Sequence, residues 1–108
     1  MEVLLSRLEN YFLTVVEYEM SYDNYYLKAA HQYCFCHRDQ ILQSSICGCF
    51  YCLEIFAPTE INEWIDEGKT ALCPRCEIDS VLGNAPIFGR ILPVEDKDFL
   101  NAMHQRWF

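Results

Sequence analysis

Two C-x-x-C pairs, separated by twenty residues, constrain this chain more than any other feature of its sequence. The four cysteines are Cys49, Cys52, Cys73 and Cys76. A two-residue spacer lets the backbone turn tightly, so that two thiolates converge on one tetrahedral ion at about 2.3 Å from each sulfur. Because protein ligands then fill all four positions, no water can be activated there. The spacing therefore predicts one structural zinc ion and not a hydrolytic centre.

The sequence is also compatible with two other uses of paired cysteines. A C-x-x-C pair also serves thiol exchange or forms a disulfide, but a redox motif normally occurs once and opens a helix after a strand. Here it occurs twice, and Pro74 inside the second copy suits a tight turn. Four cysteines can also hold an iron–sulfur cluster, although the x2, x20, x2 layout is typical of zinc.

The composition predicts one globular domain with a hydrophobic core. Of the 108 residues, 52% are hydrophobic and only four are glycine and four are proline, which excludes a disordered chain. The chain opens with an acid, and no apolar run approaches the length of a membrane helix, so we expect neither a signal peptide nor a membrane span. We expect a cytoplasmic protein. Its seven cysteines then stay reduced, and Cys34, Cys36 and Cys47 are left without a ligand role.

Residues 1–45 are predicted to form a helical hairpin. Apolar side chains recur every three or four residues over 3–19, with charged side chains on the opposite face. Turn-forming residues follow at 20–24, and a second apolar period runs over 22–44. The short connection predicts that the two helices lie antiparallel.

Residues 46–83 are predicted to form the zinc-binding core. Pro58 and Thr59 are typical of a helix start, and Gly68 supplies a left-handed end, so a short helix is expected between them. Short strands are expected over 70–72 and 78–83, on either side of the second cysteine pair.

Residues 84–108 are predicted to close the domain. Prolines and glycine make the first part irregular, and a final helix from about Glu95 turns an apolar stripe inward. The stripe consists of Phe99, Leu100, Met103 and Trp107. The predicted fold class is thus α+β and mostly helical: an N-terminal helical hairpin packed on a small four-cysteine zinc-knuckle core, with a C-terminal helix, in a single domain over 1–108.

Cys34, Cys36 and His37 suggest a second metal site. In a helix, however, residues 34 and 36 point about 200° apart, so their sulfurs cannot share an ion unless the helix is broken. His37 is interpreted as a half-buried member of the helical stripe, or as a donor to a cysteine sulfur beside the zinc. We predict that Cys34, Cys36 and Cys47 do not bind metal.

The charge balance limits the class of partner. Sixteen acidic residues oppose eight basic ones, for a net charge of −8. Nucleic acids are bound mainly through lysine and arginine, and here these are few and scattered. An acidic surface suits a basic protein partner, or serves only to keep the protein soluble. The predicted contact patch combines acids with tyrosines around the turn of the hairpin: Glu17, Glu19, Tyr22, Asp23, Tyr25 and Tyr26.

Two strings of the sequence resemble a family of small bacterial cytoplasmic proteins that is largely uncharacterised. They are Cys-Gly-Cys-Phe-Tyr-Cys at 47–52 and Cys-Pro-Arg-Cys at 73–76, within a likeness that covers about 30–108. The resemblance implies a treble-clef or zinc-ribbon-like core and carries no established activity. The family has glycine where this chain has Glu77, a difference expected to change the turn of the second knuckle.

Three functional readings follow. The leading one is a non-catalytic protein-binding module, such as an immunity protein or inhibitor that blocks a toxin. A nucleic-acid-binding zinc ribbon is an alternative that the charge disfavours. The third, a relative of His-Asn-His nucleases, draws on His31, His37 and Asp39, but no histidine lies between Cys49 and Cys76 to act as a base. We therefore predict that the protein is not an enzyme.

Overall fold

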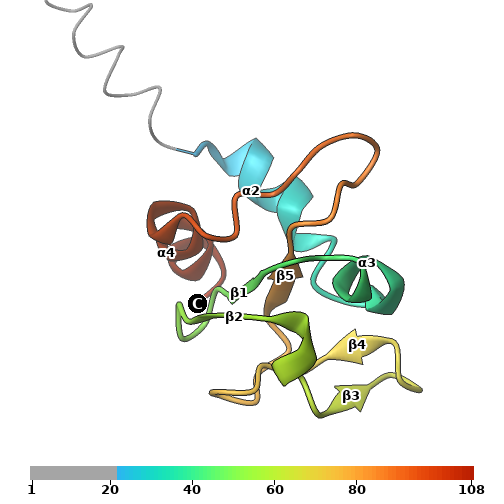
Figure 1. Ribbon diagram of the computed structural model, residues 1–108. Helices are drawn as coiled ribbons and strands as arrows, with labels where there is room; N and C mark the ends of the chain where they lie inside the picture. Colours follow the sequence, from blue (N-terminus) through green and yellow to red (C-terminus); the bar gives the residue numbers. More distant parts are fainter. Residues whose placement is uncertain (1–21) are drawn as a thin grey trace, which may run out of the picture.

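The computed structural model describes residues 22–108, so the helix predicted over 3–19 lies outside the described residues. Figure 1 shows a central group of short strands with helices above it and on either side, and a separate pair of strands below. The elements in chain order are α2 (Asn24–His31), α3 (Arg38–Leu42), β1 (Cys47–Cys49), β2 (Ile55–Phe56), the 3-10 helix η1 (Pro58–Glu60), β3 (Trp64–Ile65), β4 (Thr70–Ala71), β5 (Val81–Gly83) and α4 (Lys97–Trp107).

A three-stranded antiparallel sheet in the order β2-β1-β5 separates two hydrophobic cores. Side chains alternate between the faces of a strand, and here Leu82 belongs to one core while its neighbour Val81 belongs to the other. Helix α4 packs on the face of the sheet that carries Leu82 and forms the first core, and α3 packs on the face that carries Val81 and forms the second core (Figure 1). Both cores therefore depend on the same strands.

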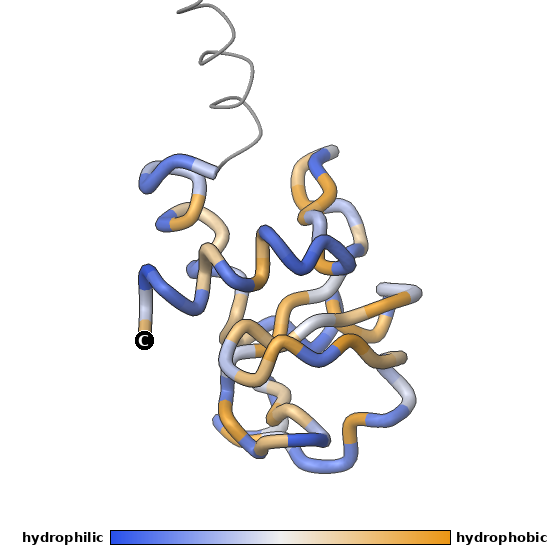
Figure 2. The backbone as a smooth tube through the Cα atoms, turned by 90° about the vertical axis from the view of Figure 1, so that its left-hand side faces the viewer, coloured by the Kyte–Doolittle hydropathy of each residue, from blue (hydrophilic) through white to orange (hydrophobic). Residues whose placement is uncertain are grey.

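Helix α4 closes the first core as predicted. The Asp96 side chain caps its start by accepting a hydrogen bond from the Asp98 N–H at 2.9 Å. Phe99, Leu100 and Met103 are fully buried. Figure 2 shows hydrophobic and hydrophilic positions alternating along this helix, which ends at the mark C. The predicted closing helix is thus confirmed.

The prediction of one continuous helix over 22–44 is wrong, because two separate helices form there. Helix α2 ends at His31, and after a turn with Cys36 in the left-handed region (φ 50°) a separate helix α3 begins at Arg38. The break is fixed by His37, which is buried between the two helices and strand β4. Local periodicity predicted the buried positions but not this interruption.

His37 joins three segments of backbone. Its Nε2 accepts a hydrogen bond from the Ala71 N–H at 3.1 Å, so Nδ1 must carry the proton that it donates to the Tyr33 carbonyl at 2.7 Å. Burial lowers the pKa of His37 below its ordinary value, although the bond to Tyr33 opposes this effect. His37 is thus a structural residue, and its hydrogen bonds go to backbone and not to a cysteine sulfur.

The short helix predicted between Pro58 and Gly68 is also wrong. Only one 3-10 turn forms, over Pro58–Glu60, and Trp64–Ile65 instead pairs with Thr70–Ala71 as a two-stranded sheet. The Arg38 guanidinium lies 4.4 Å from the centre of the Trp64 ring and donates to the Gly68 carbonyl at 2.9 Å. These contacts join residues far apart in the sequence, so no local pattern predicts them, and they stabilise the two-stranded hairpin of β3 and β4.

The predicted fold class therefore needs correction. Of the described residues, 31% are helical and 16% lie in strands, and only α4 is a long helix. The protein is not mostly helical, and an N-terminal helical hairpin is not what the described residues form. Of the four paired cysteines, Cys49 ends β1 and the other three lie in turns or loops, and α4 follows an irregular segment over 84–96.

Candidate metal centre

The four cysteines of the two C-x-x-C pairs converge on one point. All four sulfur atoms lie within 4.8 Å of one another. The Cys49 and Cys76 sulfurs are 3.7 Å apart, and so are those of Cys52 and Cys73. Ligands at about 2.3 Å from a central ion in a tetrahedron would be about 3.8 Å apart. The sulfurs are therefore already spaced for a tetrahedral metal, and none of the seven cysteines is in a disulfide.

Two similar turns hold the sulfurs in place. In the first, the Leu53 N–H donates to the Cys49 carbonyl at 2.8 Å, and in the second the Glu77 N–H donates to the Cys73 carbonyl at 2.9 Å. The N–H groups of Tyr51 and Arg75 each donate to the first sulfur of their pair at 3.3 Å. Each turn therefore aims its own N–H groups at sulfur, which favours the thiolate form that a metal needs.

Each turn ends with a residue in the left-handed region. Leu53 has φ 66° and Glu77 has φ 68°, a conformation that glycine adopts without steric strain. The two turns therefore end in the same backbone conformation. Glu77 is exposed, whereas the Leu53 side chain packs against the first core.

Replacing Glu77 with glycine should stabilise the protein. A non-glycine residue in the left-handed region costs about 1–2 kcal/mol, part of which the greater flexibility of glycine in the unfolded chain offsets. We expect a gain of about 0.5–1 kcal/mol in the free energy of unfolding, measured with denaturant on the metal-loaded protein. Glu77→Ala, which keeps the strain and removes the carboxylate, is the control. A Gly variant no more stable than the Ala variant would show that the turn is unstrained.

Burial and mutual crowding oppose ionisation at part of the centre. Burial, with a contribution from the neighbouring cysteines, raises the pKa of Cys52 to about 11 and that of Cys76 further still. Burial acts in the same sense at Cys73, but hydrogen bonds from the N–H groups of Cys76 and Arg75 and from the Cys52 and Cys76 thiols together outweigh it, so the pKa of Cys73 is lowered. A divalent cation among the sulfurs would relieve this crowding by favouring all four thiolates.

The other three cysteines lie outside this cluster. Cys34 and Cys47 are buried, and burial raises their pKa to about 11 and about 12. Cys36 is exposed, and its N–H donates to the Thr70 hydroxyl at 2.8 Å. No second group of three or more metal-binding side chains converges within residues 22–108.

The predicted contact patch is divided among different environments. Glu17 and Glu19 lie outside the described residues. Tyr22 and Tyr26 pack against Phe99 in the first core, with ring centres 5.3 and 6.0 Å away. The remaining two are Asp23, which caps α2 by accepting from the Tyr26 N–H at 2.8 Å, and Tyr25, which is 83% exposed. Of the three described tyrosines, only Tyr25 is mostly exposed, and Tyr22 and Tyr26 are half-buried.

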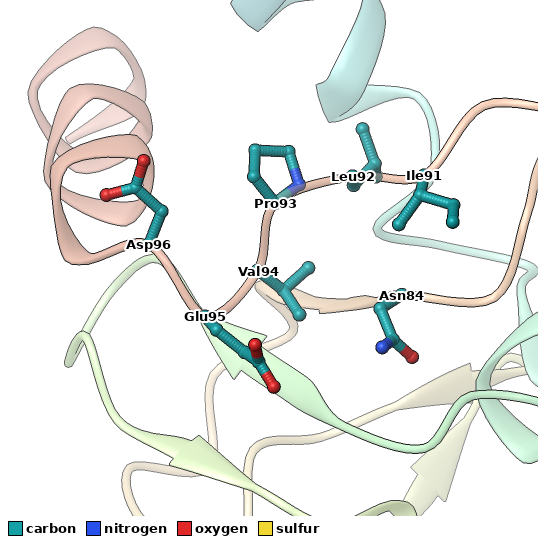
Figure 3. A pocket seen from close by; sticks show the side chains of 7 residues that line it. All are labelled: Asn84, Ile91, Leu92, Pro93, Val94, Glu95 and Asp96. Carbon is teal, nitrogen blue, oxygen red and sulfur yellow. The ribbon is translucent and has the colours of Figure 1, made fainter.

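A hollow of about 340 Å³ beside the start of α4 is large enough for a small ligand (Figure 3). Two of its polar side chains, Asn84 and Asp96, are already used by the fold. The Asp96 carboxylate accepts from the Tyr22 hydroxyl at 2.7 Å, which lowers the pKa of Asp96, and the Asn84 amide accepts from the Ser45 and Ile46 N–H groups. Figure 3 shows Glu95 pointing away from Asp96, so the two carboxylates do not converge.

The chain matches no protein-family model, and no curated protein or solved structure is significantly similar to it. Within residues 22–108, no helix is long and apolar enough to cross a membrane.

Sequence reasoning missed two residues of the centre. Leu53 adopts the same left-handed turn as Glu77, and its position directly after a second cysteine could have revealed it. Ser80 places its hydroxyl oxygen 3.1 Å from the Cys49 sulfur. Its spacing from the cysteine pairs follows no recognised motif, so no signal in the sequence pointed to it.

Proposed function

We propose that this chain is a non-catalytic, zinc-stabilised, acidic module that binds a basic protein partner, and that it acts as an inhibitor of the immunity-protein kind. The observation that carries the proposal is the closed set of four sulfurs, at distances that suit a tetrahedral ion. Such a centre builds a fold and leaves no position for a substrate. The zinc ion is favoured over iron by the spacing of the two pairs.

The basic residues support a protein partner over a nucleic acid. Seven of the eight lysines and arginines lie in the described part, since Arg7 precedes it. Four of these seven contact other parts of the protein: Arg38 binds Trp64 and Gly68, Arg75 binds Glu60, Lys97 donates to the Leu53 carbonyl, and Arg106 lies over Trp107. Few cations are left to neutralise phosphates, and an acidic protein would repel a nucleic acid.

Exposed aromatic side chains support a contact surface. Phe88, at 95% exposure, stands at the tip of a turn closed by two hydrogen bonds between Ile87 and Arg90. Tyr25 is 83% exposed. Large exposed rings on a fixed backbone are typical anchors of protein interfaces. With Glu17, Glu19 and Asp23 as rim charges, Tyr25 and Phe88 are the residues we propose for partner contact.

The test is capture of the partner from the native cytoplasm, followed by association kinetics with the purified partner. We expect association to slow as salt rises, because opposite charges steer the encounter. The variant Glu17→Lys, Glu19→Lys, Asp23→Asn should bind more weakly while keeping the fold, since asparagine still caps α2. Phe88→Ser should speed dissociation. Capture of nucleic acid or of an acidic protein instead would contradict the proposal.

The location and family are part of the same proposal. The motif strings at 47–52 and 73–76 support grouping the chain with the small bacterial cytoplasmic proteins that it resembles. Seven cysteines of which none forms a disulfide suit the reducing cytoplasm.

A further inference from the structure

The Cys49 sulfur has a neighbour that the other three sulfurs lack. The Ser80 hydroxyl oxygen lies 3.1 Å from it, and Ser80 is 1% exposed. The Ser80 backbone is held at the end of the sheet, because its carbonyl accepts from the Phe50 N–H at 3.0 Å. Within residues 22–108, this is the one hydrogen bond that the Ser80 hydroxyl forms. A buried hydroxyl in such a position is directed at sulfur and at nothing else.

The direction of this hydrogen bond follows from the metal-loaded form, so the inference rests on the proposed metal site. A cysteine that binds a metal is a thiolate and has no proton to give. The Ser80 hydroxyl must therefore be the donor, and the bond is charge-assisted. Together with the Tyr51 N–H at 3.3 Å, it gives the Cys49 sulfur a donor from a side chain as well as one from the backbone.

The four cysteines also differ in their exposure to solvent. Cys49 and Cys73 are 0% and 1% exposed, whereas Cys52 and Cys76 are partly exposed. Thiolates that accept more hydrogen bonds and lie away from solvent carry less free charge and react more slowly with electrophiles. The centre therefore has a closed half, Cys49 and Cys73, and an open half, Cys52 and Cys76.

We propose that Ser80 is a positioning residue that holds the Cys49 thiolate on the metal, so that metal exchange and attack by electrophiles begin at Cys52 and Cys76. Partners that orient metal ligands in this way typically contribute a factor of about 10–100 to metal affinity. The Ser80 hydroxyl thus makes the two halves of the centre unequal. The closed half, Cys49 and Cys73, retains the ion while the open half, Cys52 and Cys76, releases it.

The first test compares Ser80→Ala with Ser44→Ala in the full, zinc-loaded chain. Ser44 is a matched control, because its buried hydroxyl also forms hydrogen bonds, to the Gln40 carbonyl and the Ala85 N–H, but none to sulfur. Zinc transfer to a colorimetric chelator, measured well below both melting temperatures, should be about tenfold faster or more in Ser80→Ala. In the cobalt-loaded proteins, the sulfur-to-cobalt charge-transfer band should shift in Ser80→Ala alone, a readout that a loss of stability would not move.

The second test maps alkylation of the zinc-loaded chain by iodoacetamide. Each reaction joins a sulfur to the reagent's methylene carbon and releases iodide. Besides the exposed Cys36, we expect Cys52 and Cys76 to react before Cys49 and Cys73, and Cys49 to react earlier in Ser80→Ala than in Ser44→Ala. Equal behaviour of the two variants in zinc transfer and cobalt spectra, or Cys49 reacting first in the unmodified chain, overturns the inference while leaving the zinc proposal intact. A chain that binds no zinc or cobalt overturns both.

Discussion

Replacing Cys73 with serine is expected to abolish zinc binding and to unfold the protein. Cys73 is 1% exposed, and its sulfur accepts hydrogen bonds from the Arg75 and Cys76 N–H groups. A structural zinc ion contributes on the order of 10 kcal/mol in small domains, as much as the whole stability of a typical domain. Because β1 and β5 serve both cores, we expect no independent survival of the α2 and α4 packing once the ion is lost.

Metal analysis of freshly purified, reduced protein measures this directly, together with circular dichroism and chelator titration. The unmodified chain should hold one zinc ion, and Cys73→Ser should hold none and lose its cooperative unfolding transition. Cys36→Ser is the control, because Cys36 is exposed and lies outside the cluster. Zinc retained at full stoichiometry in Cys73→Ser, or a folded chain after complete chelation, would refute the metal centre.

Replacing Gly48 with alanine should destabilise the protein by about 2–3 kcal/mol, the upper part of the usual range of about 1–3 kcal/mol for overpacking a core. Gly48 lies at the middle of β1, where an added Cβ would come within 2.6 Å of the Val94 carbonyl oxygen and 3.2 Å of both Leu100 methyl groups. A backbone oxygen cannot rotate away, so the α4 side of the sheet would have to shift. The effect should reach the metal indirectly, because Cys49 is the next residue.

Denaturant unfolding of the zinc-loaded protein measures the effect, with Gly89→Ala as the control. Gly89 also resists substitution, since its φ is 80°, but nothing lies within 4 Å of an added Cβ there. Gly89→Ala therefore reports conformational strain alone, about 1 kcal/mol. If Gly48→Ala costs no more than Gly89→Ala, then α4 does not pack as closely on β1 as the structure places it.

The cysteine cluster was accessible to sequence reasoning because its chemistry is local. Two residues between paired cysteines fix a tight turn whatever surrounds it, and twenty residues between pairs are enough to return the chain. The same holds for α4, where Asp96 caps the start and Phe99, Leu100 and Met103 repeat at helical spacing.

The two misplaced helices show what local patterns omit. Trp64 and Ile65 fit a helical stripe with Ile61, but in the structure they form a strand that pairs with Thr70 and Ala71. In the same way, the apolar period through His37 and Ile41 marks buried positions without showing that His37 binds the backbone of β4. Both outcomes are set by contacts between residues distant in sequence, which override intrinsic propensity.

The central place of β1 has a consequence for the growing chain on the ribosome. β1 pairs with β2 across a short loop, Cys47 opposite Phe56, but with β5 only after Gly83 has been made. At the usual rate of translation, Cys76 follows Cys52 by roughly one to five seconds. Through that interval the nascent chain holds half of a coordination shell and one unpaired strand edge, the kind of edge that recruits other chains. If zinc is scarce when Cys76 emerges, the four thiolates stay without their ion after synthesis is complete, so the yield of native protein should depend on the metal supply at that moment.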